Sequence, residues 1–160
     1  MNNPTRIAAS VIAHSPRPMT VADLPGIHPV EQASYDHPWS IGNFADSLNA
    51  GYSMWVLELE GEVMGYYVMM AAAGEAHLLN LTIAPDWRRH GLGRDLLAHC
   101  LQCACAHQAD SLFLEVRTSN IAAISLYHSS GFVDLAVRRA YYPAGEGRED
   151  ALIMKKDLAC

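Results

Sequence analysis

The sequence of 160 residues is short of positive charge. Lysine and arginine together number 11, against 17 aspartate and glutamate residues, which gives a formal net charge of −6. A dedicated nucleic-acid-binding protein carries a basic excess, because it must neutralise phosphates. The composition therefore argues against nucleic acid as a direct partner, whereas a basic protein or peptide is compatible with it.

Long apolar runs are also missing. No stretch reaches the roughly 18 apolar residues that a helix needs to cross a bilayer. The apolar segment 7–13 near the N-terminus is interrupted by Ser10 and ends at His14, so it is too short and too broken for an export signal. We therefore expect no membrane partner and a cytoplasmic location.

Cysteine is scarce, and its spacing does not suit a disulfide framework. Cys100, Cys103 and Cys105 crowd together on the chain, and the fourth cysteine is Cys160. Secreted disulfide-rich domains space their cysteines more widely. The pattern predicts thiols that stay reduced in a cytosol.

One group of side chains is a conceivable metal site. His99, Cys103 and His107 follow one another at four-residue spacing on a predicted helix, so they would share one face. They supply only three ligands, fewer than a closed tetrahedral zinc site requires. Buried thiols and exposed histidines are the simpler interpretation, and no metal is expected.

The sequence does contain enough apolar residues for one core. Hydrophobic residues make up 51% and charged residues 18% of the chain, which excludes a disordered protein. The length favours a single domain. Pro16 and Pro18 mark the end of a flexible N-terminal arm over residues 1–16, so the domain is expected over residues 17–160.

Periodicity predicts a mixture of helices and strands. In chain order we expect helices over 20–35 and 40–51, three antiparallel strands over 52–59, 62–73 and 76–84, a long helix over 91–107, a strand over 112–116, a helix over 121–129, and two strands over 132–142 and 151–156 joined by a loop over 143–147. This order predicts one mixed α/β domain of the α+β type.

The most informative segment leads into the long helix and reads Arg88-Arg89-His90-Gly91-Leu92-Gly93-Arg94. Its glycines let the backbone approach a ligand, and the free N–H groups of a helix start attract phosphate. The segment lacks the Lys-Ser/Thr ending of a P-loop, and its two glycines do not match G-x-G-x-x-G. From these residues alone, a phosphate-binding loop and a solvated basic turn are both open.

The residues Arg88–Gly93 fit the pattern Gln/Arg-x-x-Gly-x-Gly/Ala, and in this the chain resembles the GNAT family of acetyl-CoA-dependent N-acetyltransferases. Further along, the runs 114–120, 123–127 and 131–132 resemble the family's second cofactor-side motif. The runs 138–143 and 147–151 resemble its RimI-type subgroup, the ribosomal-protein-alanine N-acetyltransferases. The family resemblance covers residues 18–157. It implies a GNAT-like fold, in which a central, mostly antiparallel, twisted sheet is flanked by helices and splayed at a cofactor cleft.

The resemblance also implies roles for individual residues. Glu115 would be the general base and Tyr127 the general acid. The backbone of Leu81, Thr82 and Ile83 would pair with the pantetheine arm of acetyl-CoA. The remaining cofactor-binding residues would be Arg88, Arg89, His90, Gly91, Leu92, Gly93, Arg94 and Asn120, while Trp39, Tyr141 and Tyr142 would line the acceptor groove.

The implied reaction is acetyl transfer from acetyl-CoA to the α-amine of the N-terminal residue, an alanine, of a basic ribosomal protein. The amine attacks directly in a ternary complex, and only its neutral form attacks. An α-amine has a reference pKa near 8 against about 10.4 for lysine, so it needs less help from a base. One alternative is acetylation of another protein N-terminus, a lysine or a small amine. The other is a non-catalytic acyl-CoA-binding module.

Each singled-out residue also has a simpler interpretation. Glu115 can be a solvent-facing strand residue that pairs with Arg117. Tyr127 can be a packed aromatic residue with a satisfied hydroxyl. Asn120 suits the N-cap of the following helix.

Overall fold

The computed structural model describes residues 15–160, so the arm predicted over residues 1–16 lies almost entirely outside the described residues. The described chain divides into two compact units. Unit 1 comprises residues 15–68 and 80–99, and unit 2 comprises residues 69–79 and 100–160.

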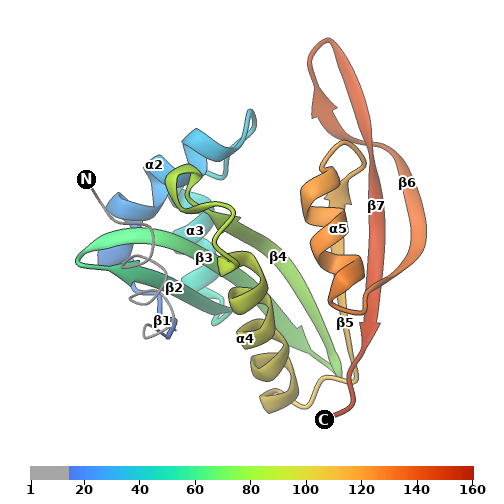
Figure 1. The fold of residues 1–160 in the computed structure, drawn as a ribbon, viewed down its shortest axis with the longest axis horizontal. Coiled ribbons are helices and arrows are strands. Elements are labelled where there is room, and N and C mark those ends of the chain that lie inside the picture. Colours follow the sequence, from blue (N-terminus) through green and yellow to red (C-terminus); the bar gives the residue numbers. More distant parts are fainter. Residues whose placement is uncertain (1–14) are drawn as a thin grey trace. The chain divides into compact units, whose positions relative to one another are not determined.

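Within the described part, seven strands follow the order β1-β2-β3-β4-β5-β7-β6 (Figure 1). The β4–β5 ladder is parallel, whereas β1–β2, β5–β7 and β6–β7 are antiparallel. The predicted mixed α/β fold with a mostly antiparallel sheet is confirmed. None of the described helices is long and apolar enough to cross a bilayer.

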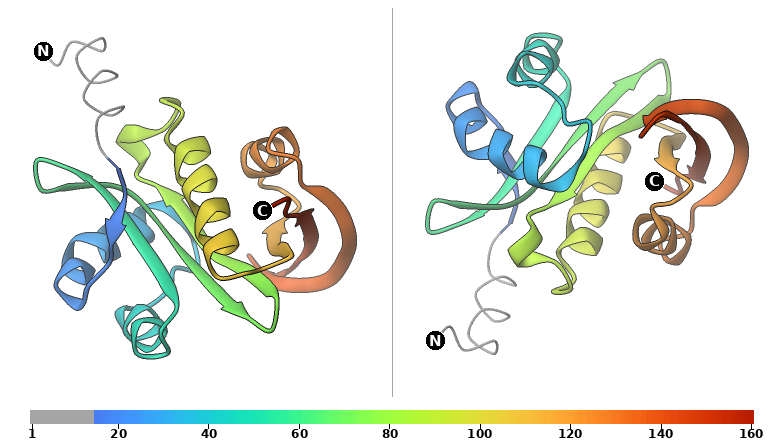
Figure 2. Two further views of the ribbon diagram at one scale, coloured as in Figure 1. Left: turned by 90° about the horizontal axis from the view of Figure 1, so that it is seen from below. Right: turned by 90° about the horizontal axis from the view of Figure 1, so that it is seen from above.

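Unit 1 is a sheet with helices on both faces. Helices α2 and α3 lie on one face of β2 and β3, and the start of α4 lies on the other (Figure 2). The elements are β1 (Arg17–Pro18), a 3-10 turn (Val21–Asp23), α2 (Leu24–Ser34), α3 (Ile41–Asn49), β2 (Ser53–Leu59), most of β3 (Glu62–Ala72), the end of β4 (Glu75–Ile83), a 3-10 turn (Pro85–Trp87) and the start of α4 (Leu92–Ala106).

Side-chain alternation along the strands explains this arrangement. Met54, Val56, Tyr66 and Val68 are buried in the core cluster with residues of α2 and α3. Gly65 faces the opposite way, where a Cβ would lie 3.0 Å from Leu96 of α4 and closer still to Ile83 and the Thr82 carbonyl. Glycine therefore allows the close contact between β3, β4 and α4.

Unit 2 is a sheet with one helix of its own, α5. Its elements are the end of β3, the start of β4, the end of α4, β5 (Ser111–Arg117), α5 (Ile121–Ser129), β6 (Val133–Ala144) and β7 (Gly147–Asp157). Leu112, Leu114 and Val116 of β5 are buried, so Glu115 and Arg117 project from the opposite face.

The predicted loop over 143–147 is wrong. Strand β6 continues through Pro143 and Ala144, which pair with Arg148 and Gly147 of β7. A proline is tolerated there because β6 is an edge strand. The turn needs only Gly145 and Glu146, and Gly145 has a φ of +52°.

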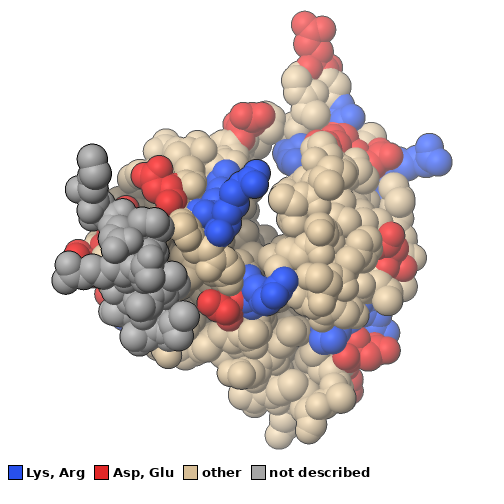
Figure 3. Space-filling view, viewed as in Figure 1, with Lys and Arg blue, Asp and Glu red and all other residues tan. Residues whose placement is uncertain are grey.

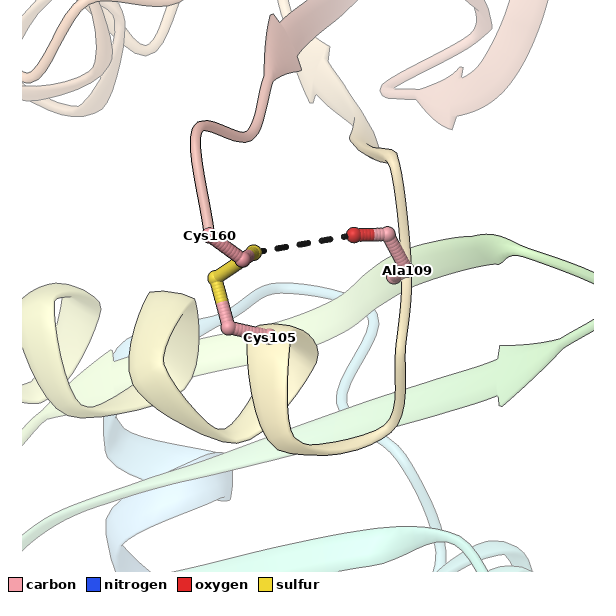
Figure 4. The surroundings of a disulfide bond; sticks show 3 residues. All are labelled: Cys105, Ala109 and Cys160. Atoms are coloured by element: carbon pink, nitrogen blue, oxygen red, sulfur yellow. Dashed lines mark hydrogen bonds between the residues drawn. A yellow bond between two sulfur atoms is a disulfide. The ribbon is translucent and has the colours of Figure 1, made fainter.

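The expectation of four reduced thiols is also wrong in this structure, because Cys105 and Cys160 form a disulfide (Figure 4). Two hydrogen bonds join the end of the chain to the start of β5, from Ser111 Oγ to Asp157 Oδ1 at 3.1 Å and from the Leu158 N–H to the Asp110 carbonyl at 2.8 Å. Spacing along the chain does not reveal such a long-range pairing. Cys100 and Cys103 are not disulfide-bonded, and burial raises the pKa of the Cys100 thiol.

Candidate active site

The Leu81–Ile83 segment of β4 presents one edge of its backbone away from β3. The Ala84 N–H donates to the Met64 carbonyl of β3 at 2.8 Å. Because backbone groups alternate in direction along a strand, the N–H and carbonyl groups of Leu81 and Ile83 point to the other edge. The β4–β5 ladder occupies only Glu75–Leu78. An extended ligand can therefore pair with this edge as an added strand.

The glycine segment follows directly and forms the start of α4. Gly91 has a φ of +78°, and a Cβ built there would meet nothing within 4 Å, so space is open over this backbone. Helix α4 begins at Leu92, and its first N–H groups lack partners within the helix. These groups, with the exposed Arg89, His90 and Arg94, fit the phosphates of a nucleotide cofactor. Figure 3 shows basic side chains over this segment.

Arg88 differs from the other residues of the segment. Its Nε donates to the Ile83 carbonyl at 3.1 Å and its Nη2 donates to Ser34 Oγ at 3.2 Å. The guanidinium therefore ties the loop to β4 and α2 instead of projecting freely.

Glu115 lies in a cluster built by β5 and β6 of unit 2. Its Oε1 accepts from Arg138 Nη1 at 3.3 Å, and the Tyr141 hydroxyl also hydrogen-bonds to it, which raises the pKa of that tyrosine. The Glu115 side chain is 34% exposed. The simpler interpretation, a pair with Arg117, is wrong because Arg117 binds Glu149 Oε2 at 3.2 Å.

Tyr141 and Tyr142 lie against this cluster, as two of the three predicted acceptor-groove residues. Arg138 stacks over the Tyr141 ring at 4.6 Å, and Arg117 stacks over the Tyr142 ring at 4.5 Å. Burial, together with the Glu115 charge, raises the pKa of Tyr142 to about 12. Both tyrosines therefore keep their protons at neutral pH.

Asn120 and Tyr127 belong to α5. The Asn120 side chain accepts from the Ala123 N–H at 3.2 Å, so its predicted N-cap role is confirmed. Tyr127 is 7% exposed, and its ring packs against Phe132 with centroids 5.6 Å apart. Its role as an acid stays a prediction.

Trp39, the third predicted acceptor residue, belongs to unit 1. Its ring is half-buried against Phe44, with centroids 5.2 Å apart, and its backbone N–H donates to Glu31 Oε1 at 3.2 Å. Part of the ring therefore serves the core of unit 1.

The conceivable metal site over His99, Cys103 and His107 does not form. Among residues 15–160, no three histidine, cysteine or acidic side chains gather as metal ligands. His99 is half-buried, with its Nδ1 2.8 Å from the Tyr67 hydroxyl, and burial lowers its pKa. The prediction that the histidines are exposed is therefore wrong for His99.

Sequence reasoning missed three charged residues of these clusters. Arg138 pairs with Glu115, and Glu149 pairs with Arg117. Each pair joins strands that are distant in the chain, so no local pattern reveals it. Glu31 had a local signal, because it follows Leu24 and Ile27 at helical spacing and so places a carboxylate on the apolar face of α2.

These features define an acetyltransferase, and comparison shows which family. Residues 20–132 match the model of the acetyltransferase (GNAT) family, and the chain belongs to it. It is an N-acetyltransferase with the GNAT fold that uses acetyl-CoA. The resemblance noted in the Arg88–Gly93 motif is confirmed.

The relatives of this chain include ribosomal-protein-alanine N-acetyltransferases. The chain is 40% identical over 136 residues to the [ribosomal protein bS18]-alanine N-acetyltransferase of Escherichia coli K12, covering 85% of this chain and 92% of the relative. The crystal structure of the ribosomal-protein-S18-alanine N-acetyltransferase from Escherichia coli matches with a TM-score of 0.85 and 37% identity over 92% of this chain and 95% of that one. Ard1 from Thermoplasma volcanium matches with a TM-score of 0.84 and 26% identity over 92% and 99%.

Proposed function

We propose that this enzyme acetylates the N-terminal α-amine of an alanine on ribosomal protein bS18, in the cytoplasm. The similarity to enzymes named for that reaction covers 85% of the chain. One structural observation carries the proposal to the residue level. The β6–β7 hairpin, which holds the RimI-type pattern, places Arg138 and Tyr141 on the carboxylate of Glu115.

Unit 1 binds the donor in this proposal. The backbone edge of Leu81, Thr82 and Ile83 that faces away from β3 pairs with the pantetheine arm, and the amides at the start of α4 hold the pyrophosphate. Arg89 and Arg94 add positive charge to the phosphate site, while Arg88 holds the loop in place. In unit 2, Asn120 contributes at the start of α5.

Unit 2 supplies the groups that move protons. Acetyl-CoA provides a thioester, whose acetyl group passes directly to the acceptor amine. Glu115 takes the proton that leaves this amine, directly or through one water molecule, because its carboxylate is exposed enough to be reached. Tyr127 gives a proton to the departing thiolate. The N–H groups at the Leu81–Ile83 edge polarise the thioester carbonyl.

The acceptor site is expected on the hairpin side of Glu115. The aromatic rings of Tyr141 and Tyr142 offer apolar surface for the first acceptor residues, and Trp39 of unit 1 is also proposed as an acceptor-binding residue. The formal net charge of −6 suits a basic ribosomal protein as acceptor. The reaction favours an α-amine over lysine because the α-amine loses its proton more readily.

Mass spectrometry of peptide products tests the proposal. The enzyme is incubated with acetyl-CoA and a peptide that carries the N-terminal sequence of bS18, beginning with alanine. Two controls are the same peptide with a blocked N-terminus and an intact lysine, and the same peptide beginning with another residue. We expect one acetyl group on the alanine α-amine and none on the blocked peptide. Acetylation of lysine alone would contradict the proposal, and so would a lack of acetylation on the peptide that begins with alanine.

A further inference from the structure

A buried carboxylate in unit 1 has no part in the chemistry proposed above. Glu31 of α2 is 1% exposed. It accepts hydrogen bonds from the Tyr66 hydroxyl, from the backbone N–H of Trp39 at 3.2 Å, and from Asn80 Nδ2, which lies 3.2 Å from both carboxylate oxygens. Every group that faces Glu31 is a donor, so the carboxylate acts only as an acceptor.

This acceptor dictates the direction of a chain of hydrogen bonds. Asn80 must turn its amide nitrogen toward Glu31, which leaves its Oδ1 to accept from Thr82 Oγ1 at 2.7 Å. Because Thr82 has thereby used its only proton, the Tyr35 hydroxyl, 2.7 Å from Thr82 Oγ1, must be the donor in that contact. We name this chain, Tyr35 to Thr82 to Asn80 to Glu31, the relay.

The relay ends beside the backbone edge of β4. Tyr35 Oη lies 3.4 Å from the Leu81 carbonyl oxygen, but its single proton is committed to Thr82. Burial raises the pKa of Tyr35, so the hydroxyl keeps that proton. The Leu81 carbonyl therefore receives no strong hydrogen bond from the relay.

We propose that Glu31 is a positioning residue that sets the direction of the relay and so keeps the Leu81 carbonyl available to an amide N–H of the pantetheine arm. This inference rests on the proposed function, which places the donor along Leu81–Ile83. This role gives a reason for the fully buried carboxylate of Glu31, because an apolar side chain would cost less free energy to bury in the core.

Replacing the carboxylate with an amide permits the relay to reverse. In Glu31→Gln, the new amide nitrogen donates to Asn80, whose side chain turns round and donates to Thr82. Thr82 then donates to Tyr35, and Tyr35 donates to the Leu81 carbonyl. Tyr35 then competes with the ligand for the Leu81 oxygen and weakens the ligand's hydrogen bond, so the dissociation constant of CoA rises about three- to tenfold.

Titration calorimetry with two ligands tests the inference. CoA carries the pantetheine arm, whereas adenosine 3′,5′-bisphosphate lacks it and reaches only the phosphate site. For Glu31→Gln we expect the weakening with CoA and unchanged affinity for the bisphosphate. Tyr35→Phe removes the proton that blocks Leu81, so the double variant Glu31→Gln/Tyr35→Phe should recover CoA affinity to within about twofold of the wild type.

If Glu31 had only a structural role, the double variant would bind CoA at least as weakly as Glu31→Gln alone. Recovery of CoA affinity in the double variant therefore distinguishes the relay from a structural role. Equal weakening of both ligands, or no recovery with Tyr35→Phe, would overturn the inference. Thr82→Val supplies a second route if Glu31→Gln does not fold, because it leaves Leu81 as the only acceptor for Tyr35 and should also weaken CoA alone. These measurements need no acetyl transfer, so they are independent of the peptide assay that tests the proposed function.

Discussion

The two units each hold a carboxylate in a hydrogen-bonded cluster, but in opposite environments. Glu31 of unit 1 is 1% exposed, and buried donors satisfy it fully. Glu115 of unit 2 has a 34% exposed side chain, and its ion-pair partner Arg138 is 55% exposed. Hydrogen-bond partners at the surface are readily replaced by water or by an incoming amine. Opening a buried network, in contrast, breaks several hydrogen bonds at once. The comparison assigns a fixed, structural carboxylate to unit 1 and a chemically accessible one to unit 2.

The largest expected effect tests this assignment directly. Glu115→Gln should lower kcat roughly 10²- to 10⁴-fold, because the base is lost, while the affinity for CoA stays that of the wild type. Glu31→Gln, assayed at saturating acetyl-CoA, should keep kcat within about tenfold of the wild type. Steady-state kinetics and calorimetry check both variants. A larger kcat loss in Glu31→Gln than in Glu115→Gln would reverse the comparison.

The second effect concerns how each unit is held together. The disulfide closes a 55-residue separation within unit 2, whereas the described part of unit 1 is packed around an apolar core without a disulfide. Cys160→Ser should destabilise the oxidised protein by roughly 2–4 kcal/mol, through greater freedom of the unfolded chain. Thermal unfolding of the variant, with and without reductant, measures this cost. Equal melting temperatures for oxidised wild type and variant would show that the bond contributes no stability.

A third substitution tests the acid in unit 2. Tyr127→Phe should slow release of the CoA thiol roughly 100-fold, because the departing thiolate loses its proton donor. The packing of the ring against Phe132 is kept, so the melting temperature should change little. A thiol-reactive dye follows the release. A wild-type rate would leave Tyr127 as a packed aromatic residue only.

A smaller effect is expected at the phosphate site of unit 1. Gly91→Val adds side-chain atoms to the open space over the loop and should raise the dissociation constant of CoA about tenfold or more. Gly51→Val is a matched control, because Gly51 has the same φ of +78° and equally open surroundings. Both variants carry a similar backbone strain of about 1–2 kcal/mol. Calorimetry that shows equal CoA affinity in the two variants would remove the phosphate site from this loop.

Much of the fold was predictable because its signals are local. The cap at Asn120, the turn at Glu60 and Gly61, and the apolar stripe of α4 each depend on neighbours in the chain. The match of Arg88–Gly93 to a known pattern likewise predicted the family.

The remaining features depend on contacts between distant residues. Cys160 meets Cys105 only because β7 returns the chain to the end of α4. Pro143 reads as a loop residue until β6 is known to be an edge strand. Arg138 lies in a run that resembles the RimI-type subgroup, but its contact with Glu115 requires the pairing of β6, β7 and β5.

Chemical rescue tests most directly whether the accessible carboxylate of unit 2 takes the proton of the amine. Glu115→Ala leaves space for a small carboxylate, and formate supplies the missing base. We predict that the low turnover of this variant rises with formate concentration, while turnover of the wild type does not change. Wild-type turnover in Glu115→Ala without formate would contradict the account, and so would a variant that binds CoA normally yet gains no activity at any formate concentration.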